Sequence, residues 1–213
     1  MKIKVIMLSL VLALSSGYAK DLTAKEYLEK GNKALKSKNF TDAFKFFKKS
    51  CDKGSAKGCR YVGVFYNNGR EVKLDNYKAL EYYKKACDGG DMIGCSNIGI
   101  MYEYGKGIEQ NFQKAIQFYK KACDGGDTHG CTNLGVKYIK GLGVKKDFKK
   151  ALKYLKKACD GNNATGCTNV GRIYDNGFGV AQNNEKAIKF YKKACEIGDM
   201  AGCLLFTLKS NSN

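Results

Sequence analysis

The sequence of 213 residues contains no proline, no tryptophan and a single histidine, His129. Without proline, the ends of helices depend on Gly, Asn and Asp, and Gly is abundant at 25 residues. Acidic residues are also scarce, because 20 Asp and Glu stand against 38 Lys and Arg, which gives a formal charge of +18. Hydrophobic residues make up 44% of the chain, so it can bury a core, and a disordered chain and a collagen are excluded.

Apolar runs are short throughout. At the N-terminus the basic segment 1–4 precedes an apolar run at 5–14, and Gly17 and Ala19 supply the small residues of a cleavage site. This pattern predicts a signal peptide over 1–19 rather than a buried first helix. The run is too short to span a bilayer, which takes roughly 20 residues. We therefore expect an exported protein, periplasmic or secreted, with no membrane span.

The ten cysteines form five pairs in which the two members are eight residues apart. The first members of successive pairs are separated by 36 residues, and a fixed period of this size is typical of solenoid repeats. The five pairs are Cys51 and Cys59, Cys87 and Cys95, Cys123 and Cys131, Cys159 and Cys167, and Cys195 and Cys203.

Alignment on this period shows two helices in each unit. The segment before a leading cysteine, such as DNYKALEYYKKAC, places Ala79, Leu80, Tyr83 and Ala86 on one helical face. The segment after a trailing cysteine, such as CSNIGIMYEYG, does the same on a shorter helix. A glycine recurs inside this second type of helix, where it indicates a close helix crossing; these glycines are Gly63, Gly99, Gly135 and Gly171.

Each unit is therefore expected to hold helix A, a Gly-rich turn, helix B and a short Gly/Asp turn. We expect a single solenoid domain over 20–213, in which the first unit has a turn that is four residues shorter and a half unit caps the C-terminus. The expected repeats are 22–54, 55–90, 91–126, 127–162 and 163–198, followed by the capping half repeat 199–208 and a polar tail at 209–213.

These motifs resemble the Sel-one-like repeat, a longer relative of the tetratricopeptide repeat. With a cysteine pair in every unit and an export signal, the chain resembles the Helicobacter cysteine-rich protein family from about Leu22 to Cys203. The first repeat departs from the pattern, because its turn has tetratricopeptide length and no cysteine precedes its helix A. The resemblance implies an all-α, right-handed α/α solenoid of helical hairpins whose A helices line the concave side.

The cysteine pairs have two interpretations, disulfides or a metal site. A turn such as 88–91 brings consecutive helices antiparallel, at a distance that a disulfide can span. A metal site is disfavoured because the chain has no CxxC motif and one histidine, and the pairs are too far apart to share an ion. We expect five disulfides, no metal and no cofactor.

Catalytic motifs are nearly absent from the sequence. Ser50 and Lys53 form one SxxK pattern, but its SDN and KTG partners are missing, and the aligned position of four other repeats holds alanine. There is no GxSxG and no HExxH, and the lone His129 has no activated nucleophile beside it. Any catalytic residues are therefore unknown at this level.

The lysine pairs of the B helices repeat every 36 residues, as at 84–85 and 120–121. One interpretation is a solvated convex face, and the other is attraction to an anionic surface polymer. Nucleic acid is not expected as a partner of an exported chain.

A ligand is expected on the A helices. If Ile98, Gly99 and Tyr102 are buried, the side chains 140° to 200° round the helix face the concave groove. Carried through the repeats, this register selects Arg60, Val64, Asn67, Ser96, Ile100, Glu103, Thr132, Val136, Ile139, Thr168, Arg172 and Asp175. The recurring Asn97, Asn133 and Asn169 have two interpretations, ligand contact or a structural hydrogen bond, and the resemblance to tetratricopeptide repeats favours the hydrogen bond.

Two functions follow. The repeats favour a binding module for a peptide, a peptidoglycan fragment or a protein. The family resemblance instead implies a penicillin-binding protein that hydrolyses β-lactams slowly, and β-lactams would then be ligands.

Overall fold

The computed structural model describes residues 21–211, and within them all regular secondary structure is helical. The expected signal peptide lies outside the described residues. Eleven helices follow one another: α1 (Ala24–Lys36), α2 (Phe40–Asp52), α3 (Ala56–Asn68), α4 (Asn76–Asp88), α5 (Met92–Tyr104), α6 (Phe112–Asp124), α7 (Thr128–Lys140), α8 (Phe148–Asp160), α9 (Ala164–Asn176), α10 (Asn184–Ile197) and α11 (Met200–Ser210). The odd-numbered helices are the expected A helices and the even-numbered ones are the B helices.

Short polar residues and glycine set the helix boundaries. The side chain of Asp75, for example, accepts a hydrogen bond from the backbone N–H of Lys78 and so caps the start of α4. Glycine follows the last residue of eight of the eleven helices. After α5 it is Gly105, with φ of 64°, a left-handed conformation that glycine adopts without strain. Glycine therefore ends the helices in this proline-free chain.

The two helices of each repeat cross closely at the recurring glycine, as the sequence predicts. A Cβ atom added to Gly99 of α5 would lie 2.6 Å from Cε1 of Tyr119 in α6, so only glycine fits there. Gly63, Gly135 and Gly171 stand in the same relation to Tyr83, Leu155 and Tyr191. These large side chains are buried and form the core between the two helices of a hairpin.

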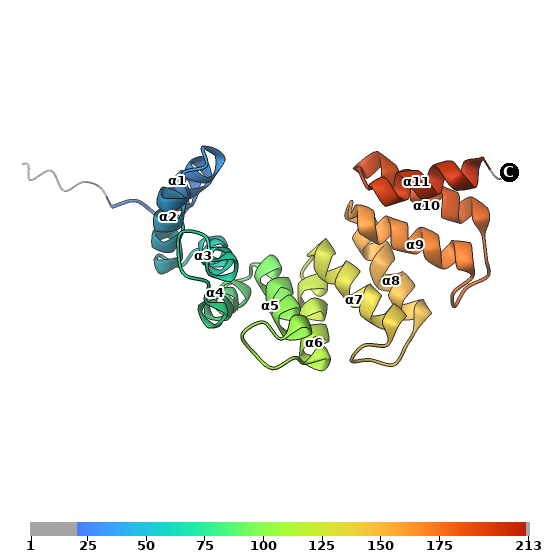
Figure 1. Ribbon diagram of the computed structural model, residues 1–213, viewed down its shortest axis with the longest axis horizontal. Coiled ribbons are helices and arrows are strands. Elements are labelled where there is room, and N and C mark those ends of the chain that lie inside the picture. Colours follow the sequence, from blue (N-terminus) through green and yellow to red (C-terminus); the bar gives the residue numbers. More distant parts are fainter. Residues whose placement is uncertain (1–20, 212–213) are drawn as a thin grey trace, which may run out of the picture.

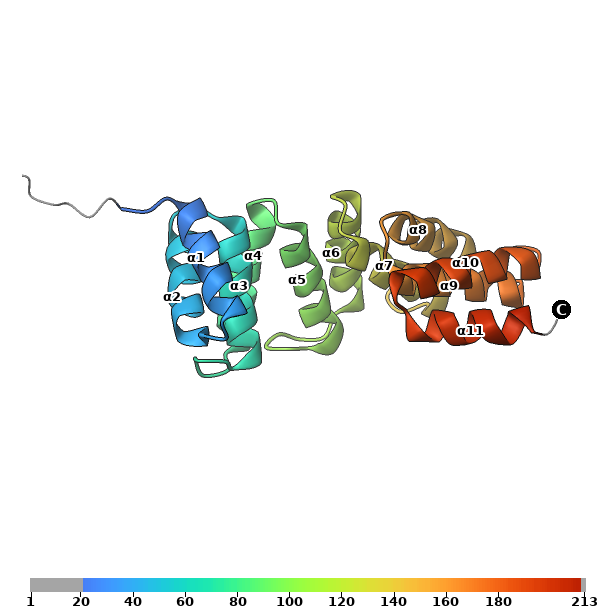
Figure 2. The same ribbon diagram turned by 90° about the horizontal axis from the view of Figure 1, so that it is seen from above.

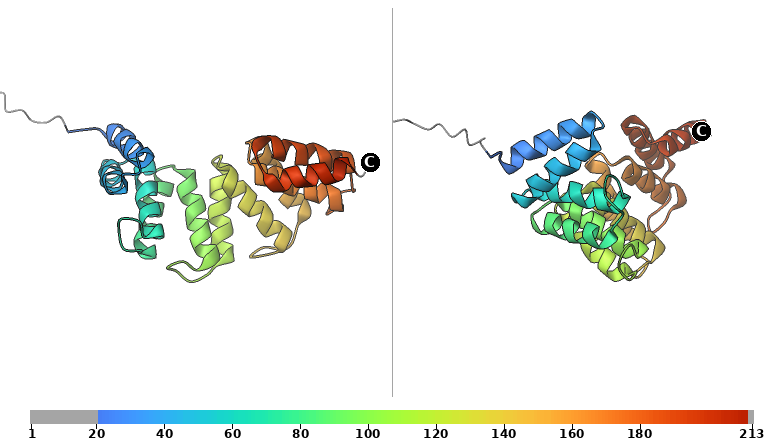
Figure 3. Two further views of the ribbon diagram at one scale, coloured as in Figure 1. Left: turned by 45° about the horizontal axis from the view of Figure 1, so that its top comes forward. Right: turned by 60° about the vertical axis from the view of Figure 1, so that its left-hand side comes forward.

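Successive hairpins stack into a curved array, with the first and last repeats at its two ends (Figures 1 and 3). The two helices of a hairpin lie side by side, and each hairpin packs against the next (Figure 2). Odd-numbered helices contact the next odd-numbered helix at α1/α3, α5/α7, α7/α9 and α9/α11, and no two even-numbered helices touch to the same extent. The odd-numbered helices therefore line the inner, concave side of the solenoid.

A disulfide closes every one of the five predicted cysteine pairs, and no cysteine is free among the described residues. Each bond joins the end of an even-numbered helix to the start of the following odd-numbered helix. Four of these bonds are almost fully buried, and they connect one repeat to the next along the array.

The two ends of the array differ from the middle. In the first repeat, only residues 37–39 separate α1 from α2, which confirms the short turn. The capping helix α11 extends two residues beyond the expected boundary at 208, because Lys209 forms an ion pair of 2.6 Å with Asp175 of the preceding odd-numbered helix. Among the described helices, none combines the length and the apolar character that crossing a bilayer demands.

Candidate functional site

Consecutive odd-numbered helices are joined by a ladder of polar contacts on the concave side. In the four repeats after the first, a side chain from the second turn of the odd-numbered helix reaches a residue 31 positions later, just before the next odd-numbered helix. Arg60 Nε donates to both carboxylate oxygens of Asp91, at 3.0 Å. The other rungs are Ser96 to Asp127, Thr132 to Asn163 and Thr168 to Asp199.

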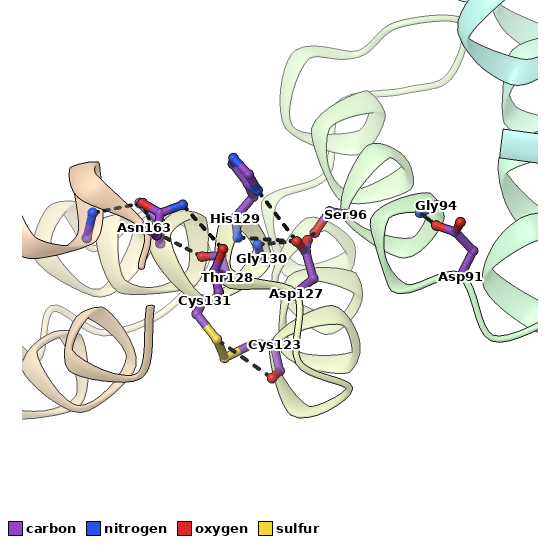
Figure 4. A network of polar contacts seen from close by, with 12 residues as sticks. Asp91, Gly94, Ser96, Cys123, Asp127, Thr128, His129, Gly130, Cys131 and Asn163 are labelled. Atoms are coloured by element: carbon purple, nitrogen blue, oxygen red, sulfur yellow. Dashed lines mark hydrogen bonds and ion pairs between the residues drawn. A yellow bond between two sulfur atoms is a disulfide. The ribbon is translucent and has the colours of Figure 1, made fainter. Parts of the chain in front are cut away.

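The acceptor of each rung also caps a helix. One Asp127 carboxylate oxygen accepts the hydroxyl of Ser96 and, at 3.0 Å, the backbone N–H of Gly130 in the first turn of α7 (Figure 4). The other oxygen accepts the N–H of His129 at 3.3 Å and lies 3.6 Å from Nδ1 of the same residue. The Asp127 side chain is 5% exposed, whereas that of His129 is 78% exposed. The aspartate is thus fully used by the fold, and the histidine is free to meet a ligand.

Two cavities lie on either side of this network. The first, of about 680 Å³, extends over the starts of α5, α7 and α9, and the second, of about 690 Å³, extends over α1, α3, α5 and α7. They share a wall formed by Ile93, Asp127, Thr128 and His129. Together they form one continuous groove along the concave side, which we call the concave groove.

The first cavity is lined by amides, hydroxyls and small apolar groups. It contains no lysine and no arginine, although the chain has 38 such residues. Its lining residues are Ile93, Ser96, Asn97, Ile100, Asp127, Thr128, His129, Thr132, Asn133, Asn162, Asn163, Ala164 and Thr165. The second cavity includes Lys57 and Arg60, and the Arg60 charge is neutralised by Asp91.

Two of the three recurring asparagines lack the structural hydrogen bond that the sequence favours for them. Asn97 and Asn133 make no hydrogen bond through their side chains, and both line the first cavity. Asn169, at the same repeat position, donates from Nδ2 to the carbonyl oxygen of Thr165 at 2.9 Å and lies outside both cavities. Two amide groups are therefore available in the groove, and the structural interpretation holds only for Asn169.

Four of the predicted groove residues line the cavities: Arg60, Ser96, Ile100 and Thr132. The hydroxyl groups of Ser96 and Thr132 take part in the ladder of polar contacts, because both side chains are nearly buried and hydrogen-bond to the next repeat. The other predicted residues line neither cavity: Val64, Asn67, Glu103, Val136, Ile139, Thr168, Arg172 and Asp175. Of these, Asn67, Glu103, Ile139 and Asp175 lie near the C-terminal ends of their helices.

Fold contacts explain why the two acidic members of this stripe, Glu103 and Asp175, turn inward. Glu103 accepts hydrogen bonds from the ammonium of Lys137 in the next odd-numbered helix and from the hydroxyl of Tyr119. Asp175 similarly meets Lys209 and Tyr191. Burial, and then the hydrogen bond to Glu103, raises the pKa of Tyr119 far above its usual value.

Sequence reasoning missed Ile93, Thr165 and the site role of His129. These residues share one repeat position in the first turn of their helices, and Ile93 is 46% exposed. Spacings of four and three residues place Ile93, Asn97 and Ile100 on one helical face. This spacing is the feature of the sequence from which the groove face of the helix could have been predicted.

No serine in the groove has the environment of a nucleophile. Ser96 is 2% exposed and donates to Asp127. Ser50, from the SxxK pattern, is fully buried and donates to the carbonyl oxygen of Ala24 at 2.7 Å. Among the described residues, no group of three His, Cys, Asp or Glu side chains is placed to hold a metal ion.

Comparison with known proteins shows similarity to repeat proteins of bacteria. The chain is 40% identical over 49 residues to HcpE of Helicobacter pylori, which is 23% of this chain and 14% of that protein. It is 38% identical over 58 residues to Beta-lactamase HcpA of the same species, which is 27% of this chain and 23% of HcpA. The matched segments therefore span less than a quarter of these relatives.

Solved structures match over a larger part of the chain. A Sel1 repeat protein from Oxalobacter formigenes superposes with a TM-score of 0.78 and 26% identity, over 84% of this chain and 75% of that chain. The Helicobacter pylori cysteine-rich protein B has 39% identity and a TM-score of 0.51, over 63% of this chain and 97% of that chain.

The Sel1 repeat itself matches five segments, 21–55, 56–91, 93–127, 128–163 and 164–199, which together span most of the chain. These segments coincide with the five helical hairpins and with the 36-residue period of the cysteines. The protein belongs to the Sel1 repeat family.

Proposed function

We propose that this protein is an exported binding module that holds an extended peptide segment in the concave groove. The observation that carries the proposal is the pair of unbonded amides, Asn97 and Asn133, in a cavity with no basic side chain. A primary amide offers one acceptor and two donors, which match the N–H and C=O groups of a peptide backbone. Unpaired polar groups of this kind are suited to ligand contact rather than to packing.

The spacing of the two asparagines supports an extended chain. They lie on α5 and α7, neighbouring helices whose axes are about 8–10 Å apart when packed. An extended peptide rises about 3.3 Å per residue, so three residues cover this distance. Ile93 and Ile100 then offer contact to small apolar side chains between the polar points.

The lining of the first cavity disfavours two other ligands. It contains no Phe, Tyr or Trp ring on which a sugar could stack, and no Lys or Arg to bind the carboxylates of an acidic polymer. The disulfides reduce the flexibility of the walls, because each one joins consecutive repeats. Less conformational entropy is then lost when a ligand binds. A peptide is therefore favoured over a peptidoglycan fragment.

Export is supported by the N-terminal sequence pattern and by the five disulfides, since disulfides form and persist in oxidising compartments. The periplasm and the extracellular space both fit this inference.

The proposal is tested with a peptide selected from a random display library against the purified protein. We expect Asn97→Ala with Asn133→Ala to weaken its binding at least tenfold in a fluorescence anisotropy assay. Asn169→Ala is the matched control, because Asn169 has the same repeat position but is bonded to Thr165 and lies outside the cavity. This control should change the affinity less than threefold. Equal losses in both variants, or failure of the selection to yield any peptide, would contradict the proposal.

A second candidate is slow hydrolysis of β-lactams, and it is supported by the similarity to Beta-lactamase HcpA. A β-lactam resembles a short peptide and would enter the same groove, where His129 is an exposed titratable group. Turnover of a chromogenic β-lactam by protein from a host without β-lactamase, compared between wild type and His129→Asn, tests this candidate. Absence of turnover in the wild type would remove it.

A further inference from the structure

The outer side of the solenoid has one repeat that is more basic than the others. In α8, Lys149, Lys153 and Lys157 are four residues apart, so they form one exposed stripe with a rise of about 6 Å per step. The same positions hold Tyr77, Glu81 and Lys85 in α4, Gln113, Gln117 and Lys121 in α6, and Glu185, Lys189 and Lys193 in α10. Three lysines in line are therefore a property of α8 and not of the repeat.

The turn before α8 adds further positive charge. Lys145 and Lys146 are both exposed there, and the one acidic residue nearby, Asp147, caps α8 and pairs with Lys150 at 3.7 Å. Lys145, Lys149 and Lys153 make no hydrogen bond and no close ion pair. In α4, by contrast, Lys85 is bonded to Glu81 at 2.7 Å. The ammonium of Lys157 in α8 donates to the carbonyl oxygen of Cys123 at 2.7 Å. We call Lys145, Lys149, Lys153 and Lys157 the α8 lysine surface.

The positive field extends to the neighbouring even-numbered helices. Asp124 at the end of α6 is bonded to Lys120 at 2.7 Å, and this bond, with the charges of Lys120, Lys157 and Lys153, holds the pKa of the carboxyl below its usual value. On the other side, Lys193 of α10 lies 3.8 Å from Asp160 at the end of α8.

Two shallow clefts with lysines in their walls adjoin this surface. One, of about 350 Å³, is lined by Tyr138, Val144, Lys145, Lys146, Asp147 and Lys150. The other, of about 470 Å³, is lined by Asp160, Lys189, Phe190, Lys192, Lys193 and Glu196. Each cleft places three ammonium groups close together, an arrangement that fits an anionic unit.

We propose that the α8 lysine surface binds an anionic polysaccharide, with carboxylate, sulfate or phosphate groups along its chain. A flexible chain of spaced charges can follow the stripe and enter both clefts. This surface lies on the even-numbered helices, whereas the concave groove lies on the odd-numbered ones, so the two sites are separate.

The same surface is less suited to a lipid membrane or to nucleic acid. None of the large apolar side chains that are exposed among the described residues belongs to α8, so the surface offers nothing to insert into a bilayer. It has no arginine for bidentate contacts to bases or phosphates. The rings of Tyr138 and Tyr154 stack on each other at 5.7 Å, and the ammonium of Lys150 lies 5.6 Å from the Tyr138 ring, so they are not free to stack on bases.

Binding of a sulfated heparin fragment tests the proposal, with the full secreted protein titrated at physiological ionic strength and in a salt series. The triple variant Lys145→Gln, Lys149→Gln and Lys153→Gln should bind at least tenfold more weakly and show a shallower salt dependence. The control Lys25→Gln, Lys33→Gln and Lys36→Gln removes three exposed lysines from α1, at the far end of the array, and should lose less than threefold. Circular dichroism should show unchanged helicity in both variants.

Equal losses in the two triple variants would mean that only net charge matters, and they would overturn the proposal. Vesicles with phosphatidylglycerol and duplex DNA are tested in parallel. Tighter binding of either one, with the same sensitivity to the α8 substitutions, would assign the surface to that partner instead. Because the substituted lysines lie outside the concave groove, failure here would leave the peptide proposal intact.

Discussion

The ammonium of Lys137 in α7 and the carboxylate of Glu103 in α5 form an ion pair that is almost completely buried between consecutive repeats. The two side chains are 4% and 13% exposed, and the hydroxyl of Tyr119 donates to the same carboxylate at 2.7 Å. Glu103 and Tyr119 of one repeat and Lys137 of the next thus form a polar unit in the core of the array.

The same three positions alternate in chemistry along the solenoid. Two repeats later, Asp175, Tyr191 and Lys209 form a second polar unit. In the repeat between them, the positions of the three polar residues are occupied by Ile139, Leu155 and Ile173. At these three repeat boundaries the set is therefore matched, either polar or apolar, and a single charged member would leave a buried charge without a partner. The boundary before them holds Asn67, Tyr83 and Met101, a set without a charged side chain.

Replacing Lys137 alone should consequently be costly. Lys137→Ile leaves the Glu103 carboxylate buried and unpaired, and we expect the free energy of unfolding to fall by about 3 kcal/mol. The triple variant Glu103→Ile, Tyr119→Leu and Lys137→Ile copies the apolar set and should lie within about 1 kcal/mol of wild type, since replacing a whole buried polar set by a packed apolar one costs little. Urea unfolding followed by circular dichroism measures both. A triple variant as unstable as the single one would refute the matched-set interpretation.

The position of a disulfide along the array should determine the effect of its removal. Each bond closes a loop of about nine residues, so its loss should lower the free energy of unfolding by roughly 2.5 kcal/mol on the chain-entropy estimate. Removing the central pair with Cys123→Ala and Cys131→Ala should also weaken the coupling between the two halves, because repeats contact only their neighbours. Removing the terminal pair with Cys195→Ala and Cys203→Ala should increase hydrogen exchange in α11 and leave α6 and α7 protected. Identical hydrogen-exchange patterns in the two variants would show that the effect does not depend on the position of the disulfide along the array.

We expect Ser50 to stabilise the fold and to have no role as a nucleophile. Its hydroxyl is fully buried and bonded to Ala24, so no substrate can reach it without unfolding of the first hairpin. We expect Ser50→Ala to lower the free energy of unfolding by about 1 kcal/mol, the usual worth of such a hydrogen bond, and to leave any β-lactam turnover unchanged. A tenfold loss of turnover with unchanged helicity would instead identify Ser50 as a nucleophile.

The buried tyrosines should make the fold sensitive to alkali. Burial raises the pKa of Tyr83, Tyr119 and Tyr191, whereas in the unfolded chain a tyrosine has a pKa of about 10. Above this pH the unfolded state loses these protons and the folded state keeps them, so stability should fall as the pH rises beyond about 10. Absorbance at 295 nm should show these tyrosines titrating later than the exposed ones, and Tyr119→Phe should lose less stability between pH 9 and 11 than wild type. Titration of all tyrosines together near pH 10 would contradict the prediction.

The repeats were predictable from the sequence because their signals are local and recur every 36 residues. The cysteine pairs, the glycine that meets Tyr119 and the short first turn each follow from spacing alone. The exact lining of the groove was not predictable in the same way. It depends on how neighbouring odd-numbered helices are placed, and on side chains such as Ser96 and Glu103 that turn toward partners about 31 to 34 residues away. Helical periodicity identifies a face of one helix, but it does not show which polar groups on that face are already bonded.

The double role of Asp127 has a consequence for how such a protein can change in length. Its carboxylate caps its own helix and receives the hydroxyl of Ser96 from the repeat before, so each repeat supplies one half of a connector and receives the other. A gene duplication that copies 36 residues copies both halves, so the new repeat would carry the hydroxyl and the acceptor of this connector. At the last described helix, Leu204 occupies the position of Ser96 and no further helix start follows it among the described residues. The hydroxyl half of the connector is therefore lacking in α11. An evolving array of this type could gain or lose interior repeats while this last described helix stays distinct.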